Sequence, residues 1–149
     1  MYRKGVSVLI INKNKEFLLV SLESFKEEFF AVPGGGIEQG ETLENAVYRE
    51  IYEELGIIKT SLQFVGQSNI PIKFKFKVIK MNREGKDYEG SERYFFGFRF
   101  IGVDDEIKPK NGEVRAYRWV SFVQLKDYLL FDDQLKNTQE KIEEIFTDF

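Results

Sequence analysis

Acidic side chains crowd into one stretch of the chain, GGGIEQGETLENAVYREIYEELGI, which covers residues 34–57. Arg49 is its only basic residue, and its glutamates are Glu38, Glu41, Glu44, Glu50, Glu53 and Glu54. Like charges at helical spacing repel one another, so a counter-charge is expected to offset the repulsion. Carboxylates beside a glycine-rich turn are suited to binding a divalent cation that in turn holds phosphate oxygens. The stretch is therefore a candidate metal site.

A helix is predicted over residues 43–55 by the spacing of its apolar residues. Thr42 is suited to the N-cap, and Gly56 to the left-handed position that ends a helix. The third residue after Thr42 is Asn45 rather than a glutamate, so a full capping box is not expected.

The carboxylates flank the predicted buried side of this helix. Its apolar stripe comprises Val47, Ile51 and Leu55. The i, i+3, i+4 spacing directs Glu50, Glu53 and Glu54 toward a single point beside that stripe, where water is partly excluded. The alternative is a glutamate-rich surface helix with a purely structural role. That alternative explains neither the glycine turn nor the convergence of charge.

The chain of 149 residues contains neither cysteine nor histidine. This composition excludes disulfides, thiolate nucleophiles, histidine-based triads and zinc sites of the cysteine or histidine type. In an enzyme, carboxylates would then do the acid–base work, and oxygen ligands suit Mg²⁺ or Mn²⁺. The net charge of −3 argues against a broad electrostatic surface for nucleic acid.

A single domain is expected over residues 1–149, because the chain shows no repeat and no long linker. No apolar run approaches the length of about 18 residues that a membrane span needs. The first residues lack a signal-peptide cleavage pattern. We expect a cytoplasmic protein without membrane association, either a monomer or a homodimer.

The pattern along the chain predicts an α/β (α+β) fold with a central mixed sheet and helices packed on it. Strands are predicted at residues 5–12, 16–23, 29–32, 61–67, 73–80, 93–102 and 114–121. Besides the helix at 43–55, helices are predicted at 123–130 and 133–146, and a loop tip at 83–86.

The stretch from Gly35 to Ile57 resembles the Nudix box. Gly35, five residues, Glu41, seven residues and then REIYEELGI match every defined position of that motif. The resemblance implies the family's αβα sandwich, with the catalytic helix following the glycine-rich loop. It also implies Mg²⁺- or Mn²⁺-dependent hydrolysis of a nucleoside diphosphate linked to another moiety.

The resemblance assigns roles by position. The implied metal ligands are the carbonyl of Gly34 and the carboxylates of Glu50, Glu53 and Glu54. Glu53, or else Glu50, would be the general base, because a carboxylate beside the cation can take the proton of the attacking water. Arg49 would pair with Glu41 and hold the loop against the helix.

Glu113 is a further catalytic candidate. It lies just before the strand predicted at 114–121, where some family members bring an additional acid over the metal from a loop. Taken alone, a glutamate in a polar loop is an ordinary solvated residue.

Outside the box, three segments are similar to dinucleoside polyphosphate hydrolases and bacterial RNA 5′-pyrophosphohydrolases, namely residues 2–6, 92–96 and 113–120. This similarity implies that Arg3, Lys73 and Lys75 contact distal phosphates. It also implies that Tyr94 or Phe30 stacks on a base. The alternative is that the aromatic residues belong to the core and the lysines to the solvated face of a strand.

Two departures from those subfamilies keep other substrates open. The subfamilies commonly show Pro-Gln-Gly-Gly where this chain has PGGG at 33–36, and a basic residue near the end of the second strand where it has Ser21 and Leu22. The nearest basic residue beyond is Lys26. A nucleotide sugar or a (deoxy)nucleoside triphosphate is the alternative substrate, and a non-catalytic nucleotide-binding regulator is the alternative of another class.

Overall fold

The computed structural model describes residues 1–81 and 87–147, with the backbone alone for 76–81 and 87. The loop tip expected at 83–86 lies outside the described residues. The strands are β1 (Tyr2–Ile11), β2 (Glu16–Leu22), β3 (Gly34–Gly36), β4 (Leu62–Gln67), β5 (Ile72–Met81), β6 (Asp87–Phe100) and β7 (Val114–Ser121). The helices are α1 (Leu43–Leu55) and α2 (Gln134–Ile145), with short 3₁₀ helices at Lys59–Ser61, Asp104–Glu106 and Phe122–Asp127.

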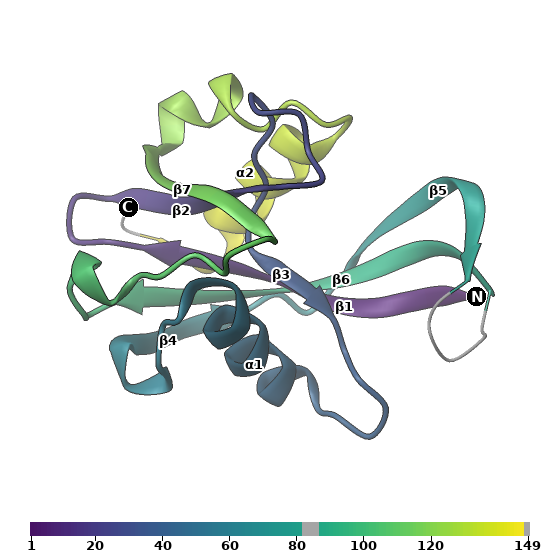
Figure 1. Cartoon of the computed structure of the whole chain (residues 1–149), viewed down its shortest axis with the longest axis horizontal. Coiled ribbons are helices and arrows are strands. Elements are labelled where there is room, and N and C mark those ends of the chain that lie inside the picture. The colour runs from purple at the N-terminus through teal and green to yellow at the C-terminus, as the bar shows by residue number, and fades with distance from the viewer. Residues whose placement is uncertain (82–86, 148–149) are drawn as a thin grey trace.

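The strands form one mixed sheet in the order β4-β6-β1-β2-β7, to which β3 adds beside β1 and β5 beside β6. β1 and β6 run parallel, and the other described pairs run antiparallel. The two α-helices lie on opposite sides of the sheet (Figure 1). The mixed sheet with helices on it confirms the predicted fold class.

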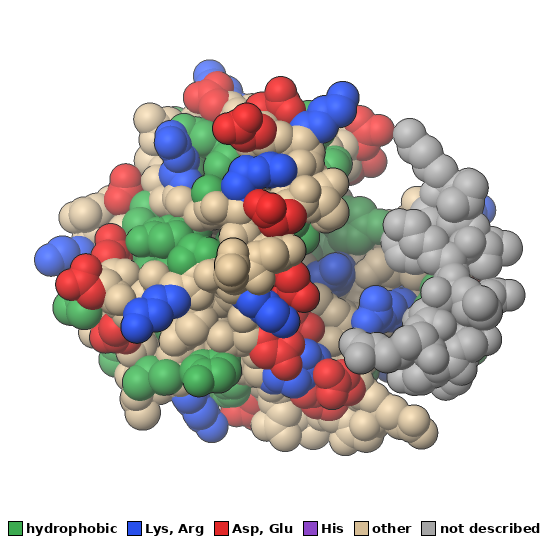
Figure 2. Space-filling model, in the orientation of Figure 1, with side chains coloured by type: hydrophobic (Ala, Val, Ile, Leu, Met, Phe, Trp, Pro, Cys, Tyr) green, Lys and Arg blue, Asp and Glu red, His purple; other side chains and the backbone are tan. Residues whose placement is uncertain are grey.

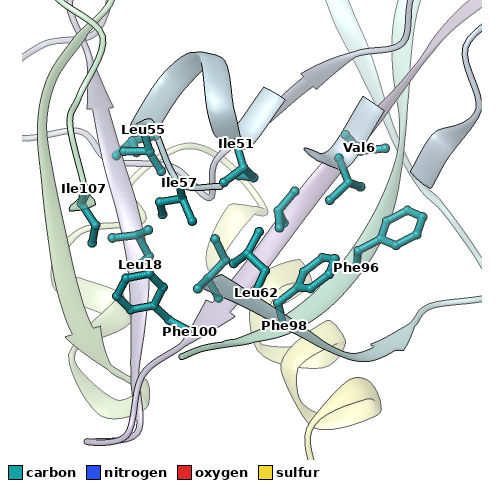
Figure 3. Close-up of a cluster of buried hydrophobic side chains, with 14 of the residues drawn as sticks. Val6, Leu18, Ile51, Leu55, Ile57, Leu62, Phe96, Phe98, Phe100 and Ile107 are labelled. Atoms are coloured by element: carbon teal, nitrogen blue, oxygen red, sulfur yellow. The ribbon is translucent and has the colours of Figure 1, made fainter. Parts of the chain in front are cut away.

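Each face of the sheet carries its own core, because successive residues of a strand point to opposite faces. On the α1 face, Ile51 and Leu55 of the helix belong to one buried cluster with Phe98 and Phe100 of β6 (Figure 3). On the α2 face, Phe146 packs edge-on against Phe17, with ring centroids 5.5 Å apart. The sheet therefore separates two hydrophobic cores, one under each α-helix.

α1 has the predicted bounds and the predicted caps. The side chain of Thr42 accepts a hydrogen bond of 3.1 Å from the N–H of Asn45. Gly56 adopts a left-handed conformation with φ 69°, and its N–H donates to the carbonyl of Tyr52. Both ends of the helix that carries the acidic residues are thus fixed.

Two predicted elements were wrong. Residues 29–32 do not form a strand, because only Ala31 bridges to Val20 while the N–H of Phe30 donates to Tyr128 instead. The short strand is Gly34–Gly36, just beyond Pro33. Residues 123–130 do not form an α-helix, because a 3₁₀ helix spans Phe122–Asp127 instead.

Two strands start earlier than predicted. β1 begins at Tyr2 and β6 at Asp87, and the parallel ladder between them pairs Tyr2 with Gly90. The added residues are mostly polar, and they extend the ladder beyond the core. A hydrophobic pattern therefore does not predict them as part of the strands.

Candidate active site

The glycine strand β3 brings the backbone unusually close to neighbouring groups. Gly34 pairs with Ser7 of β1, and a Cβ atom on Gly34 would collide with the carbonyl oxygen of Val6. A Cβ atom on Gly35 would lie 2.5 Å from the carboxylate of Glu50. Glycine is therefore required here so that the α1 carboxylates can lie directly against β3.

Arg49 fastens the loop after β3 to α1. Its Nε and Nη2 donate to the two carboxylate oxygens of Glu41 at 2.7 and 2.8 Å, and Nη2 also donates to the carbonyl of Gly36 at 2.9 Å. This two-pronged bond lowers the pKa of Glu41 below its usual range, mainly through the hydrogen bond from Arg49. The predicted pairing of Arg49 with Glu41 is confirmed.

The same guanidinium also contacts two of the predicted metal ligands. Its Nη1 donates to Glu50 at 2.9 Å and to Glu53 at 3.4 Å. Burial raises the pKa of Glu50, and Arg49 opposes that rise. Arg49 thus links the loop to the carboxylates and limits how they can move.

Glu54 is the most deeply buried of the three carboxylates, with 8% of its surface exposed. One oxygen accepts a hydrogen bond of 3.1 Å from the N–H of Gly34. Burial, and next the charge of Glu50, raise the pKa of Glu54 to about 8, although the Gly34 N–H lowers it. Its negative charge is therefore only partly compensated by the protein.

Glu50, Glu53 and Glu54 share one side of α1, as predicted, but their oxygens do not gather at one point. Glu50 and Glu53 both accept from Nη1 of Arg49, Glu54 accepts from the N–H of Gly34, and Glu53 leaves 44% of its side chain exposed. Across residues 1–81 and 87–147, no group of three acidic side chains is already arranged as a metal cage. Side-chain rotation would be needed to close one.

The donor set nevertheless fits a hard divalent cation. It consists of carboxylate and backbone oxygens without nitrogen or sulfur, which are the ligands that Mg²⁺ and Mn²⁺ prefer. A cation here would also supply the positive charge that the buried carboxyl of Glu54 lacks.

The loop before β7 places Glu113 near these residues. The N–H groups of Lys108 and Lys110 donate to the carbonyls of Leu55 and Glu54 at 2.7 and 2.8 Å, which holds the loop on the end of α1. The charge of Glu113 contributes to the raised pKa of Glu54. Glu113 is exposed and forms an ion pair of 3.4 Å with Lys110.

Two arginines lie on the other side of β3. A Cβ atom on Gly36 would overlap the guanidinium of Arg3, so Arg3 packs directly on the glycine strand. Arg93 of β6 donates to the carbonyl of Val6 at 2.9 Å and to the hydroxyl of Ser91 at 3.2 Å. Burial lowers the pKa of Arg93, against the charges of Glu50 and Glu54, which raise it. Figure 2 shows acidic and basic side chains side by side over this part of the molecule.

The sequence pattern predicts no role for Arg93. The sequence feature that could have identified Arg93 is its charge immediately before the apolar run Tyr94–Phe96, in a strand whose other residues are typical of a hydrophobic core. A charge in such a place is rare unless it is paired or functional.

The remaining predicted residues lie elsewhere. Lys73 and Tyr94 line an open groove that contains none of the α1 carboxylates, and Lys73 lies 5.4 Å from the ring centre of Tyr2. Lys75 is exposed on β5. Phe30 is 9% exposed and packs edge-on against Tyr128, so its ring belongs to the core and is not free to stack on a base.

A comparison with protein-family models matches the NUDIX domain over residues 1–144. The chain belongs to the NUDIX domain family. This Nudix chain is 30% identical over 148 residues to the RNA pyrophosphohydrolase of Pelagibacter ubique, an alignment that covers 96% of this chain and 92% of the relative.

Solved structures confirm the Nudix fold. The Ap4A hydrolase of C. elegans, in a binary complex, superposes with a TM-score of 0.70 at 19% identity, covering 99% of both chains. The dihydroneopterin triphosphate pyrophosphohydrolase of E. coli superposes with a TM-score of 0.74 at 16% identity, covering 97% of this chain and 99% of that one. In the part of the chain that the structure describes, no helix is long and apolar enough to cross a bilayer.

Proposed function

We propose that this Nudix protein is a Mg²⁺- or Mn²⁺-dependent hydrolase of a pyrophosphate bond. The preferred substrate class is the triphosphorylated 5′ end of RNA or a dinucleoside polyphosphate. The observation that carries the proposal is the undercompensated carboxyl of Glu54, buried beside Glu50 against a strand built of glycine. A purely structural acidic helix has no need of a buried carboxyl whose one described hydrogen bond comes from a backbone N–H.

The residues proposed to hold the cation are Gly34, through its carbonyl, and Glu50, Glu53 and Glu54. When bound, the cation would lower the pKa of the attacking water and neutralise charge on the phosphate oxygens. Arg49 keeps Glu50 and Glu53 within one hydrogen-bonded unit, which limits the rotation needed to bring them together.

Glu53 is the proposed general base, and Glu50 is the second choice. Among the described residues, Glu53 is held only by a long contact of 3.4 Å with Arg49, so its oxygens can accept the proton that water loses as its oxygen attacks phosphorus. The bridging P–O bond breaks in the same displacement, and the leaving phosphate carries away the bonding electron pair. Glu113 is the proposed further acid at the rim of the site.

Arg3 and Arg93 are proposed to bind phosphate oxygens from the side of β3 opposite the carboxylates. A guanidinium presents paired N–H donors that match a phosphate, and both arginines lie next to the glycine strand. Lys73 and Lys75 are too solvent-exposed to fix a phosphate on their own, and we propose that they contribute only to long-range attraction.

The choice of substrate rests on the similarity to an RNA pyrophosphohydrolase across almost the whole chain. A nucleotide sugar or a nucleoside triphosphate is the alternative substrate. A non-catalytic nucleotide-binding regulator is the alternative of another class, and it predicts ligand binding without turnover.

The test is hydrolysis of a panel of these substrates in the presence of Mg²⁺ and Mn²⁺. We expect cleavage of at least one of them, and Glu53→Gln or Glu50→Gln should lower kcat by about 10²–10⁴-fold, the usual contribution of a general base. Glu44→Gln, an exposed glutamate in the first turn of α1, is the matched control. Full activity in both active-site variants, with unchanged circular dichroism, would refute the assignment.

A further inference from the structure

Lys141 is a buried lysine of α2 that the proposed reaction does not use. Only 5% of its surface is exposed. Its ammonium donates to the hydroxyl of Ser68 at 2.5 Å, to the carbonyl of Ile70 at 2.7 Å and to the carboxylate of Glu144 at 3.3 Å. A lysine ammonium has three protons, so these partners use its full donor capacity. Lys141 therefore fastens residues 68–70 to α2.

Residues 68–71 form a bulge between β4 and β5, which both pair with β6. Gln67 at the end of β4 pairs with Phe96, and Ile72 at the start of β5 pairs with Arg93. The four residues 68–71 therefore lie opposite the two residues of β6 between those pairs. An irregularity of this kind bends the strand and redirects the side chains that follow it. The 68–71 bulge thus sets the direction in which β5 begins.

The 68–71 bulge is held by hydrogen bonds more than by packing. Ser68 is 1% exposed, its N–H donates to the carbonyl of Phe95 at 2.9 Å, and its hydroxyl donates to the carbonyl of Ile70 at 3.2 Å. The side chain of Ile70 is 72% exposed, so its burial contributes little. The bond from Lys141 to the Ile70 carbonyl therefore supports the outer part of the bulge.

Stability alone does not account for a charged residue at position 141. Its partner Glu144 is exposed, so an uncharged side chain in place of Lys141 would leave no buried carboxylate without a counter-charge. The Ser68 hydroxyl would still donate to the Ile70 carbonyl. Replacing buried ionic groups by apolar side chains of similar volume often leaves stability unchanged or raises it. A role in placing the chain that follows the bulge accounts for the lysine better.

β5 begins beside Arg93, which is proposed to bind phosphate. Ile72 pairs with Arg93. Phe74 pairs with Ser91, whose hydroxyl accepts a hydrogen bond of 3.2 Å from Arg93, and Phe74 and Arg93 line one cavity. β5 and β6 extend together beyond both α-helices, so the course of β5 depends on how it begins (Figure 1). A small displacement of β5 would therefore be passed on to the guanidinium of Arg93.

We propose that Lys141 is a positioning residue for substrate binding. It holds the 68–71 bulge to α2, and the bulge places the start of β5 so that Arg93 meets the phosphates. The inference rests on the proposed function and adds to it a residue that does not touch the substrate. Loss of Lys141 should weaken phosphate binding more than it slows the chemical step, because the carboxylates of α1 stay in place.

The kinetic test is Lys141→Met with the best substrate of the panel. We expect KM to rise about tenfold, the loss expected when one hydrogen bond to a charged phosphate is weakened, and kcat to change by less than about twofold. The midpoint of urea unfolding should stay the same or rise. Lys126→Met, which removes the charge of an exposed lysine, is the control and should leave KM unchanged.

Ser68→Ala is a second, milder variant, because it removes one partner of Lys141 and no charge. It should raise KM in the same direction. The double variant should have the KM of Lys141→Met alone, since both changes disrupt the same set of hydrogen bonds. If Lys141→Met does not fold, Ser68→Ala decides in its place.

Calorimetry with methylenediphosphonate, a non-hydrolysable diphosphate without a base, measures phosphate binding apart from turnover. With Mg²⁺ present, Lys141→Met should raise Kd by the same factor as KM, about tenfold, and Lys126→Met should bind like the wild type. Wild-type affinity in Lys141→Met would overturn the inference, and so would failure of the wild type to bind the diphosphonate. A fall in the urea midpoint together with an equal loss of kcat would show a merely structural role and overturn it as well.

The binding test also separates this inference from the proposed function. If no substrate of the panel is cleaved but diphosphonate binding still depends on Lys141, the proposed hydrolase function fails while the positioning role stands. If substrates are cleaved and Lys141→Met binds the diphosphonate like the wild type, the hydrolase function stands and the positioning role fails.

Discussion

Glu54 shows how one residue can be poorly placed for stability and well placed for function. Its carboxyl is buried near that of Glu50, and its only described hydrogen bond comes from the Gly34 N–H. Residues with perturbed pKa values of this origin gather at functional sites. The position of Glu54 beside the apolar stripe was predictable from spacing, whereas its hydrogen bond from the Gly34 N–H became apparent only when β3 was placed.

The pKa of Glu54 predicts how stability depends on pH without metal. The folded-state pKa is about 8 against an ordinary value of 4.5, so the folded state binds more protons between these values. The stability from protonated Glu54 is present below the ordinary value and is lost as pH rises through the folded-state value. In EDTA, the melting temperature should therefore fall from pH 5 to pH 8 (about the span of the two pKa values) more steeply in the wild type than in Glu54→Gln. An equal fall in melting temperature in the wild type and in Glu54→Gln would contradict this prediction.

Arg49 gives a second prediction at this scale. A lysine cannot reproduce the two-pronged bond to Glu41 together with the contact to Gly36. Arg49→Lys should lower the free energy of unfolding by about 1–2 kcal/mol, the usual worth of hydrogen bonds to a charged group discounted for partial exposure. Urea titration measures this change. Arg118→Lys, an exposed arginine with one described side-chain bond, should change it much less.

At the scale of elements, the sequence predicted α1 to the residue but misplaced the short strand before it. The periodic apolar stripe, Thr42 and Gly56 all act locally, and they fix α1 independently of the rest of the fold. β3 is different, because three glycines carry no strand propensity. They form a strand only because the folded chain brings them beside β1, with which they pair. Arg93 was missed for a related reason, since its contacts depend on residues that are far away in the sequence.

The glycine strand can be tested directly. The Cβ atom added by Gly35→Ala would overlap the Glu50 carboxylate and push it away from β3. We expect kcat to fall by about 10²-fold, as displacements near 1 Å can cause, while the protein stays folded. Gly66→Ala is the control, because its added Cβ atom would lie 3.4 Å from Ile145 at ordinary packing distance. Equal activity in both variants would mean that Glu50 does not need its place against β3.

At the scale of the whole molecule, the two faces of the sheet carry different features. The α1 face holds the carboxylates and the α2 face holds a cavity of about 280 Å³, with β3 and Arg93 between them. The sequence could predict the acidic face, because its residues lie within one stretch. It could not predict the cavity, whose walls come from β1, β5, β6 and α2 and meet only in the folded chain.

This division predicts that metal binding depends on residues of the α1 face and does not depend on those of the α2 face. Mg²⁺ that binds only the folded state should raise the melting temperature, with a stabilisation of about 2.7 kcal/mol at 100 times its Kd. The shift should disappear in Glu50→Gln and persist in Phe131→Ala, because Phe131 lies on the opposite face of the sheet from α1. Thermal denaturation over a series of Mg²⁺ concentrations, with and without an α,β-methylene nucleoside triphosphate as a non-hydrolysable analogue, measures these shifts. The absence of any shift at millimolar Mg²⁺, even with the analogue, would favour a purely structural role for the acidic stretch. Loss of the Mg²⁺ shift in Phe131→Ala would instead show that the two faces are coupled through Arg93.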